Sequence, residues 1–336
     1  MAVDVLGIGC CAVDDVLYVD RYPSADSKME VRQRERRCGG LTSIALMTAA
    51  RLGASCQFAG ALGNDDLSRY ALAAMNEYGV DTSTVVVRPD ARPVYSVIVV
   101  DRSTQSRTIL YDPNNVYGAD VVLPSAELIR EARVLYIDHY GVPGMIRAAR
   151  IAREAGIPVV ADLEDDHSPG FDELLGLVDH LILSQDFALR ITRQATPAGA
   201  AQKLWRNDRS AVIVTAGAEG CWYVDGPVPP THCPAFKLTV RDTTGCGDVF
   251  HGAYAAALAQ HLALPERVCL ASAAAALKAA NVGGPAGIPP GDEVRRFLAA
   301  RPTEVRSDAR ASGATATAAS AKRLSRRRPA IQTRKA

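Results

Sequence analysis

The chain has 336 residues, 48% of them hydrophobic, so it can bury a large core as one big domain or one domain with an inserted lobe. No apolar run is long enough to span a membrane, and residues 1–10 carry acid where a signal peptide needs base. The eight cysteines form no C-x-x-C pair, which argues against a zinc site or a disulfide framework. We therefore expect a cytoplasmic protein with reduced thiols and no membrane partner.

The net charge of +1 conceals a strongly basic end. Residues 301–336 hold ten Lys and Arg against two acids, which leaves 28 basic and 35 acidic side chains in residues 1–300. This end is rich in Ala, Ser and Thr and has no apolar period, so we predict a disordered tail. Such a tail could bind nucleic acid or an acidic partner non-specifically, but a solvated appendage with no specific nucleic-acid partner is the favoured interpretation.

Helical and strand-like stretches alternate along the rest of the chain, which predicts an α/β fold. The first strand is expected at Val3–Gly9, and with Ala12 its end matches G-x-G-x-x-A, part of a dinucleotide-binding pattern. That pattern requires a helix next, whereas Val16–Val19 is strand-like and Pro23 follows it. A nicotinamide-dependent enzyme is therefore the weaker hypothesis.

Two segments show the alternation of exposed strands. Lys28–Arg37 carries charge on both faces, and Pro93–Pro113 contains strand-like Tyr95–Asp101 and Arg107–Asp112 around a turn. Together they predict a small sheet with one covered face. Lys28 would be either a solvated edge charge or a substrate contact, and the two interpretations are about equally favoured.

Glycines precede the first two predicted helices. Cys38-Gly39-Gly40 permits a tight turn before a helix of small residues at Ile44–Leu52. Gly60–Asp66 precedes a helix that runs to Tyr78, and its acids are most simply helix-start residues.

Three buried strands are expected in the middle of the chain, at Ala132–Asp138, Pro158–Asp162 and His180–Ser184, with helices at Pro143–Ala155 and Phe187–Thr192. Asp162 ends its strand, at the edge of an open α/β sheet where ligands bind.

The clearest strand is the β-branched run Ala211–Thr215, which leads into T-x-G-x-x-G at Thr215–Gly220. Cys221–Val224 and Ala235–Arg241 should form a hairpin after it. A helix of small residues is then expected at Glu266–Asn281, ended by the glycine-rich loop 283–289.

The most informative stretch is Arg241–Leu258, RDTTGCGDVFHGAYAAAL. Two glycines around one small residue allow backbone N–H groups to approach a ligand, and the following helix adds the positive end of its dipole. Asp248 is expected at the first position of that helix, where an acid is most often a simple cap. An acid at the mouth of a glycine-built anion hole, however, is what phosphoryl transfer requires.

D-T-T-G-C-G-D-x-F-x-G resembles the C-terminal signature of the ribokinase-like, or PfkB, carbohydrate kinases, and G-G-L-T-S-I-A resembles their N-terminal signature. The resemblance covers about residues 3–300. It implies a three-layer α/β/α fold with a mostly parallel central sheet, over residues 1–300, with lid strands inserted at about 15–38 and 93–113. It also implies ATP-dependent phosphorylation of a sugar hydroxyl, and a homodimer formed through the lid.

The resemblance also assigns roles to individual residues. Asp248 would accept the proton of the attacking hydroxyl, and the sugar would lie near Asp14, with Asp15 as its competitor. The remaining assignments are Gly245, Cys246 and Gly247 for the anion hole; Lys28, Gly39 and Gly40 for the sugar; Thr215, Gly217, Gly220 and Asn281 for ATP; Asp242, Thr244, Ala286 and Gly287 for a monovalent cation such as K⁺; and Asp162 for Mg²⁺.

Two departures from the family pattern leave the substrate open. Ile44 stands where the family has a sugar-binding Asn, and Ser184–Phe187 replaces the N-x-x-E that organises Mg²⁺. Either Asp162 or Asp186 would substitute, or the nucleotide phosphates would mainly hold the metal. A ketohexose or pentose is the leading interpretation. A sulfosugar, a nucleoside and a catalytically impaired nucleotide-binding regulator are the alternatives. The helix-start position predicts a low pKa for Asp248 and a lowered pKa for Cys246.

Overall fold

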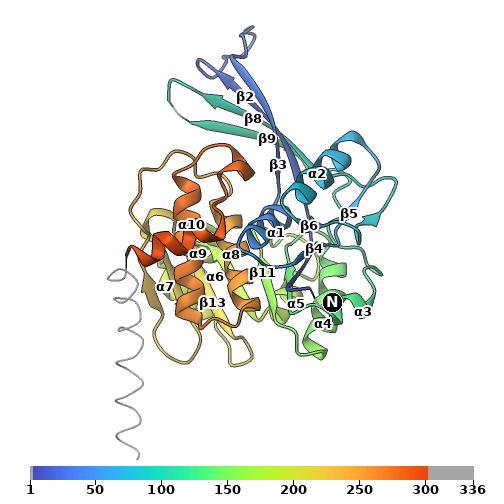
Figure 1. The fold of residues 1–336 in the computed structure, drawn as a ribbon, viewed down its shortest axis with the longest axis vertical. Coiled ribbons are helices and arrows are strands. Elements are labelled where there is room, and N and C mark those ends of the chain that lie inside the picture. Colours follow the sequence, from blue (N-terminus) through green and yellow to red (C-terminus); the bar gives the residue numbers. More distant parts are fainter. Residues whose placement is uncertain (1–2, 105, 302–336) are drawn as a thin grey trace, which may run out of the picture.

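The computed structural model describes residues 3–104 and 106–301, so the predicted basic tail, apart from Arg301, lies outside the described residues. A large sheet with helices on both faces forms the body, and a smaller sheet projects from it (Figure 1). The predicted three-layer α/β/α fold with a separate small sheet is confirmed. Within the described part of the chain, no helix is both long enough and apolar enough to cross a membrane.

Nine strands form the central sheet: β1 (Val5–Ile8), β4 (Cys56–Phe58), β6 (Val80–Asp81), β10 (Val134–Ile137), β11 (Val159–Asp162), β12 (His180–Ser184), β13 (Ala211–Thr215), β14 (Cys221–Val224) and β15 (Thr231–Cys233). Their order is β15-β14-β13-β12-β11-β10-β1-β4-β6. All neighbours from β13 to β6 pair in parallel, and β14 and β15 add antiparallel pairs at one edge. Every residue of β1, β10 and β11 is buried, as helices on both faces require.

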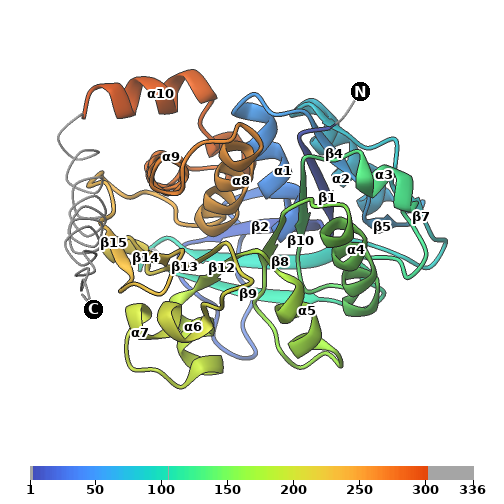
Figure 2. The same ribbon diagram turned by 90° about the horizontal axis from the view of Figure 1, so that it is seen from below.

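Two layers of helices enclose this sheet (Figure 2). One layer contains α1 (Leu41–Arg51), α2 (Asp66–Glu77), α8 (Cys246–Ala259), α9 (Leu264–Ala279) and α10 (Gly291–Ala299), and the other contains α3 (Ala126–Arg130), α4 (Val142–Glu154), α5 (Phe171–Leu177), α6 (Gln185–Thr192) and α7 (Pro197–Leu204). Each layer forms its own hydrophobic cluster against one face of the sheet.

Helix α8 is held firmly in its layer. Ten of its fourteen residues are buried, and it packs so closely on α1 that a Cβ at Gly252 would lie 2.1 Å from the carbonyl oxygen of Ala45. A residue with a side chain cannot occupy that position without moving one of the two helices. This packing fixes the place of the N-terminus of α8.

The projecting sheet, here called the lid, consists of β2 (Ala12–Val19), β3 (Gln33–Gly39), β8 (Val94–Asp101) and β9 (Arg107–Asp112) in the order β3-β2-β8-β9. Only residues 9–11 separate β1 from β2, so the lid follows directly on β1, the third strand from the β6 edge of the central sheet (Figure 1). A third sheet pairs β5 (Ala61–Leu62) with β7 (Val86–Val87).

Two expectations about these strands are wrong. The predicted strand Ala235–Arg241 is absent from the described residues 235–241, because β14 pairs instead with Thr231–Cys233, directly after the short connection 225–230. The lid strand begins at Gln33, so Lys28 lies in the exposed connection between β2 and β3 and not in a strand.

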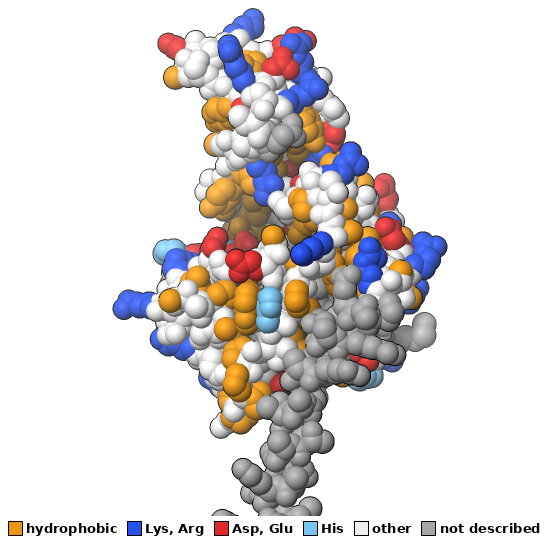
Figure 3. All heavy atoms as spheres, turned by 90° about the vertical axis from the view of Figure 1, so that its left-hand side faces the viewer, with side chains coloured by type: hydrophobic (Ala, Val, Ile, Leu, Met, Phe, Trp, Pro, Cys, Tyr) orange, Lys and Arg blue, Asp and Glu red, His pale blue; other side chains and the backbone are white. Residues whose placement is uncertain are grey.

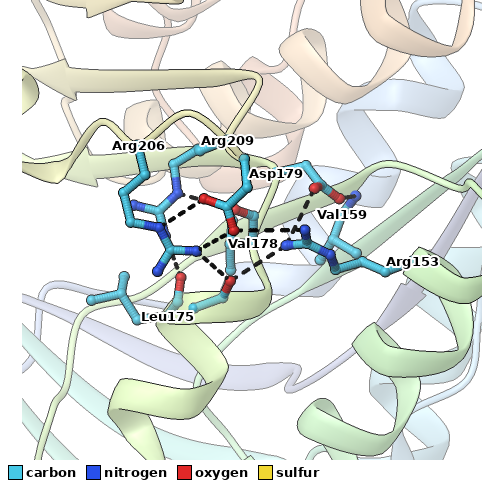
Figure 4. A network of polar contacts seen from close by, with 9 residues as sticks. Arg153, Val159, Leu175, Val178, Asp179, Arg206 and Arg209 are labelled. Atoms are coloured by element: carbon cyan, nitrogen blue, oxygen red, sulfur yellow. Dashed lines mark hydrogen bonds and ion pairs between the residues drawn. The ribbon is translucent and has the colours of Figure 1, made fainter.

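Buried Arg209 joins two helices to the start of β13 (Figure 4). Its Nε donates to the carbonyl oxygen of Val178 at 3.0 Å, and its Nη1 donates to that of Leu204 at 2.6 Å. Nη2 donates to the carbonyl oxygen of Leu175. Burial lowers the pKa of Arg209 to about 10, which still leaves the side chain charged at neutral pH. One side chain therefore satisfies the C-terminal backbone of α5 and α7.

We predict that Arg209→Met lowers the free energy of unfolding by about 3 kcal/mol or more, because three carbonyl groups lose their donor. Urea unfolding followed by circular dichroism measures this. Arg150→Met is the control, since Arg150 makes an exposed ion pair with Glu173 and its loss should cost under about 1 kcal/mol. An equal effect of the two substitutions would contradict the assignment.

Candidate active site

A cavity of about 410 Å³ lies between the lid and the N-terminus of α8. Figure 3 shows the molecular surface hollowed between the projecting lid and the body. The lid lines the cavity with Asp14 and Arg37 and with apolar side chains such as Val16 and Ile98. The body supplies residues 240–245 and the first turn of α8.

The start of α8 has the geometry of an anion site. Gly245 is the N-cap residue, with φ of 76°, and no side chain among the described residues caps the helix. The N–H of Cys246 makes only a 3.3 Å contact with the carbonyl oxygen of Thr243. The first turn therefore offers backbone donors and the positive end of the helix dipole to the cavity.

Asp248 lies in this first turn, as its third residue and not its first, and its side chain lines the cavity. The predicted low pKa is wrong. Burial raises the pKa of Asp248 well above its ordinary value, the negative charges of Asp162 and Glu164 raise it further, and nearby His251 opposes them. The dipole of one helix end is weaker than burial combined with two like charges.

His251 connects the first turn of α8 to the central sheet. Its Nδ1 lies 2.8 Å from the carbonyl oxygen of Gly247 and 3.3 Å from Oδ2 of Asp162, and its Nε2 lies 3.0 Å from the carbonyl oxygen of Ile182. All three partners are acceptors, so each ring nitrogen of His251 faces at least one acceptor. The sequence motif F-H-G alone could not identify His251 as a site residue, because two of its partners, Asp162 and Ile182, lie in strands β11 and β12.

Asp162 and Glu164 are acids whose charges act on Asp248 but which are not among the residues that line the cavity; Asp162 is buried at the end of β11, and Glu164 is exposed two residues later. Burial raises the pKa of Asp162 well above its ordinary value, and the charge of Glu164 raises it further. The neighbouring acids are engaged elsewhere: Asp165 contacts His167, and Asp166 accepts from Nη1 of Arg190 at 2.6 Å. The hard oxygens of Asp162 and Glu164 suit Mg²⁺, which would relieve their repulsion.

The lid distinguishes Asp14 from Asp15, because successive residues of a strand point to opposite faces. Asp14 lines the cavity, where burial raises its pKa, partly offset by a hydrogen bond from Ser96 and by the charge of Arg37. Asp15 lies on the other face, where its carboxylate pairs with Arg36 at 2.7 Å. The cavity therefore receives Asp14 alone.

The glycine turn predicted for the sugar also reaches the cavity. Gly39 and Gly40 both line it, and Gly40 has φ of 104° with a Cβ position only 2.6 Å from the backbone of Cys11 and Ala12. Ile44 lines the same wall and presents only hydrocarbon there. Lys28, in the β2–β3 connection, is exposed and is not among the lining residues.

The residues predicted to bind ATP lie outside this cavity. Thr215 ends β13 at the same edge of the sheet as Asp162, and exposed Gly217 begins the 3₁₀ turn Gly217–Glu219 that Gly220 follows. Asn281 follows α9 and its Nδ2 donates back to the carbonyl oxygen of Leu277 at 3.1 Å.

The cavity also contains cations that sequence reasoning missed, Arg37, Arg107, Arg241 and Lys278. Lys278 is the one with a recognisable signal, as a single charge within the alanine-rich run of α9. Its side chain is 1% exposed, and its Cδ would lie 3.1 Å from a Cβ at Gly287. Lys278 thus stands among the residues predicted to hold a monovalent cation, Asp242, Thr244, Ala286 and Gly287.

Cys246 differs from its predicted state. Burial raises the pKa of its thiol to about 11, although the charge of Lys278 acts in the opposite direction. Enclosure by the lid and the helix layers outweighs the helix dipole, so the thiol is protonated at neutral pH.

We predict that iodoacetamide alkylates Cys246 slowly at pH 7 and about tenfold faster for each pH unit up to about 11, because only the thiolate reacts. Mass spectrometry of the Cys246 peptide measures the rate, and the protein unfolded in urea is the reference. Rapid alkylation at neutral pH in the folded protein would contradict the raised pKa.

Comparison with known proteins agrees with this geometry. The sequence model of the pfkB family carbohydrate kinases matches residues 4–289. The chain is 24% identical to a ribokinase from Haemophilus influenzae over 298 residues, covering 87% of this chain and 97% of that protein. It is 28% identical to fructokinase-1 from Oryza sativa over 290 residues, covering 77% of this chain and 88% of that protein. The structure of Arabidopsis thaliana ribokinase complexed with ribose and ATP has the same fold, with a TM-score of 0.79 and 22% identity. The match covers 89% of this chain and 99% of that chain. The chain belongs to the pfkB family of carbohydrate kinases.

Proposed function

We propose that this protein transfers the terminal phosphoryl group of ATP to a hydroxyl group of a ketohexose or pentose. The observation that carries the proposal is that one cavity brings Asp248 and an uncapped helix start together with Asp14 of the lid. A base, an anion hole and a hydroxyl-binding carboxylate are the groups that this reaction requires.

Asp248 is the proposed base for the attacking hydroxyl. Its raised pKa brings it nearer to the pH at which it works, and a stronger base takes a proton from an alcohol more readily. His251 holds the carbonyl oxygen of Gly247, one residue before Asp248, and so acts as a positioning residue for the first turn of α8.

The backbone N–H groups of Gly245, Cys246 and Gly247 are the proposed anion hole for the transferring phosphoryl group. The buried α8 fixes these donors before substrate binds, so little reorganisation is required during the reaction. Cys246 acts here through its backbone, since its protonated thiol adds no charge.

The proposed sugar site consists of Asp14, Gly39 and Gly40, with Ile44 packing on an apolar face of the sugar. The names of two relatives, ribokinase and fructokinase, cover a pentose and a ketohexose, which is the range that we propose. The position of Lys28 outside the cavity argues against its role in this site.

ATP is proposed to bind along Thr215, Gly217 and Gly220, with Asn281 near the adenine. Thr215 ends β13 at the same carboxyl edge of the sheet as Asp162, and nucleotides bind at this edge of open α/β sheets, which supports the proposal. Asp162 and Glu164 would hold Mg²⁺, which neutralises phosphate charge when it is bound. We also propose a homodimer through the lid, whose strand β9 exposes Ile109, Leu110 and Tyr111.

ADP release measured with a panel of ribose, fructose, other sugars, sulfosugars and nucleosides tests the substrate class. We expect turnover on a pentose or ketohexose. A preference for a nucleoside or a sulfosugar would replace our assignment with that substrate. ATP binding without turnover on any member of the panel would instead indicate a nucleotide-binding regulator.

We predict that Asp248→Asn lowers kcat by about 10²- to 10⁴-fold, because the hydroxyl loses its proton acceptor, while ATP affinity changes little. The same substitution should raise the thermal unfolding midpoint of the ligand-free enzyme at neutral pH. A carboxyl whose pKa rises on folding destabilises the folded state above its ordinary pKa, and the amide removes that cost. Near-normal turnover would refute the assignment of the base.

A further inference from the structure

Lys278 is a buried cation that the proposed reaction does not use directly. It comes from the last turn of α9, is 1% exposed, and its Nζ has no hydrogen-bond partner within the described ranges 3–104 and 106–301. An ammonium group removed from water without hydrogen bonds is costly unless other charges stabilise it. Its surroundings must therefore supply negative charge.

Asp242 lines the cavity together with Lys278, and the charge of Lys278 acts on it. Burial is the largest single influence on Asp242 and acts to raise its pKa. The hydrogen bonds from Thr244, and then the charge of Lys278, act in the other direction, and the pKa is lowered overall. Oδ1 of Asp242 accepts the N–H of Thr244 at 2.9 Å, and Oδ2 lies 3.9 Å from Nη1 of Arg37. The chain around Asp242 is tied to α9, since the N–H groups of residues 241 and 242 both donate to the carbonyl oxygen of Ala279.

The aliphatic stem of Lys278 packs against the loop 284–287. A Cβ at Gly287 would lie 3.1 Å from Cδ and 3.2 Å from Cε of Lys278, so the backbone of the loop 284–287 packs directly on this side chain. The charge of Lys278 also acts on Cys246, the first residue of α8. The ammonium group therefore stands between the Asp242 loop, the loop 284–287 and the anion hole.

These residues do not fit a potassium ion. Asp242, Thr244, Ala286 and Gly287 are the positions at which the family resemblance implies a monovalent cation. In this chain the carboxylate of Asp242 already has an N–H group and two side-chain cations around it, and Gly287 contacts the lysine stem. A metal cation there would meet a like charge in a buried place.

We propose that the ammonium group of Lys278 replaces the monovalent cation, so that this enzyme works at full rate without K⁺. The lysine positive charge holds the Asp242 loop in place and adds to the positive potential at the start of α8. Lys278 is a positioning residue in this role, since it acts through Asp242 and the helix start. The activity test of this proposal rests on the proposed kinase function, whereas the test of cation binding, by the thermal unfolding midpoint, does not.

The first experiment compares the full-length enzyme in potassium chloride and in tetramethylammonium chloride at equal ionic strength. We expect the same kcat/KM in both salts and the same thermal unfolding midpoint, because a cation that binds the folded state raises that midpoint. Activation of the wild-type enzyme by K⁺ together with a higher midpoint would overturn the proposal. The midpoint reports on the cation site even if no sugar in the panel is a substrate.

The second experiment changes Lys278 itself. Lys278→Met keeps the volume of the stem and removes the charge, and should lower kcat by about tenfold or more while circular dichroism shows an intact fold. Lys278→Ala opens space and should gain a K⁺-dependent rise in midpoint and in turnover that the wild type lacks. Unchanged turnover in the Met variant, or no K⁺ effect on a folded Ala variant, would contradict the proposal.

Lys203→Met is the matched control. The Nζ of Lys203 donates to the carbonyl oxygen of Thr192 at 2.8 Å in the opposite helix layer, far from the cavity in the fold. This variant should keep wild-type turnover and show no response to K⁺. A loss of turnover equal to that of Lys278→Met would show that the effect is not specific to Lys278.

Discussion

Like charges held near the first turn of α8 are the constraint on which the rest of this structure depends. Burial raises the pKa of Asp162 and of Asp248, the charge of Glu164 raises both further, and the charge of Asp162 also raises the pKa of Asp248. Such an arrangement destabilises the ligand-free fold, so other parts of the molecule must hold it in place. The imidazole of His251, buried between α8 and the sheet, is the nearest of these supports.

The wider support is the packing of α8. Its alanine-rich surface and Gly252 let α1 approach within backbone contact, which leaves the helix no freedom to move away from the acids. Lys278 and Arg37 line the same cavity as Gly245 and Asp248, so they bring positive charge to the proposed anion hole. Negative and positive charges thus lie close together around the first turn of one rigid helix.

Much of this architecture could be predicted from the chain. Strands β12, β13 and β14 coincide with the predicted segments because β-branched and apolar runs between turn residues are local signals. Asp14, Gly245 and Asp248 line the cavity because their motifs specify the position of each residue as well as its type. The predicted strand at Ala235–Arg241 failed because the partner of β14 depends on the length of a connection, which local propensity does not encode.

Charge states were the part that could not be predicted. The low pKa expected for Asp248 and for Cys246 came from one local interaction, the helix dipole, whereas both pKa values are dominated by burial under segments far away in the chain. His251 and Lys278 were missed for the same reason. The partners of His251 are in β11 and β12, and the neighbours of Lys278 are in the Asp242 loop and in residues 284–287.

The attachment of the lid has a mechanical consequence. Asp14 lies on β2, which leaves the central sheet after only three residues, whereas Asp248 is fixed in the body. The register pairs Asp14 with Arg37 on one side and Ser96 on the other, so backbone pairing holds these three residues in one sheet. Residues 9–11 join this sheet to β1 and Gly40 joins it to α1, so a tilt of the lid about these connections would change the gap between Asp14 and Asp248. The distance between these two carboxyl groups therefore depends on the angle between the lid and the central sheet.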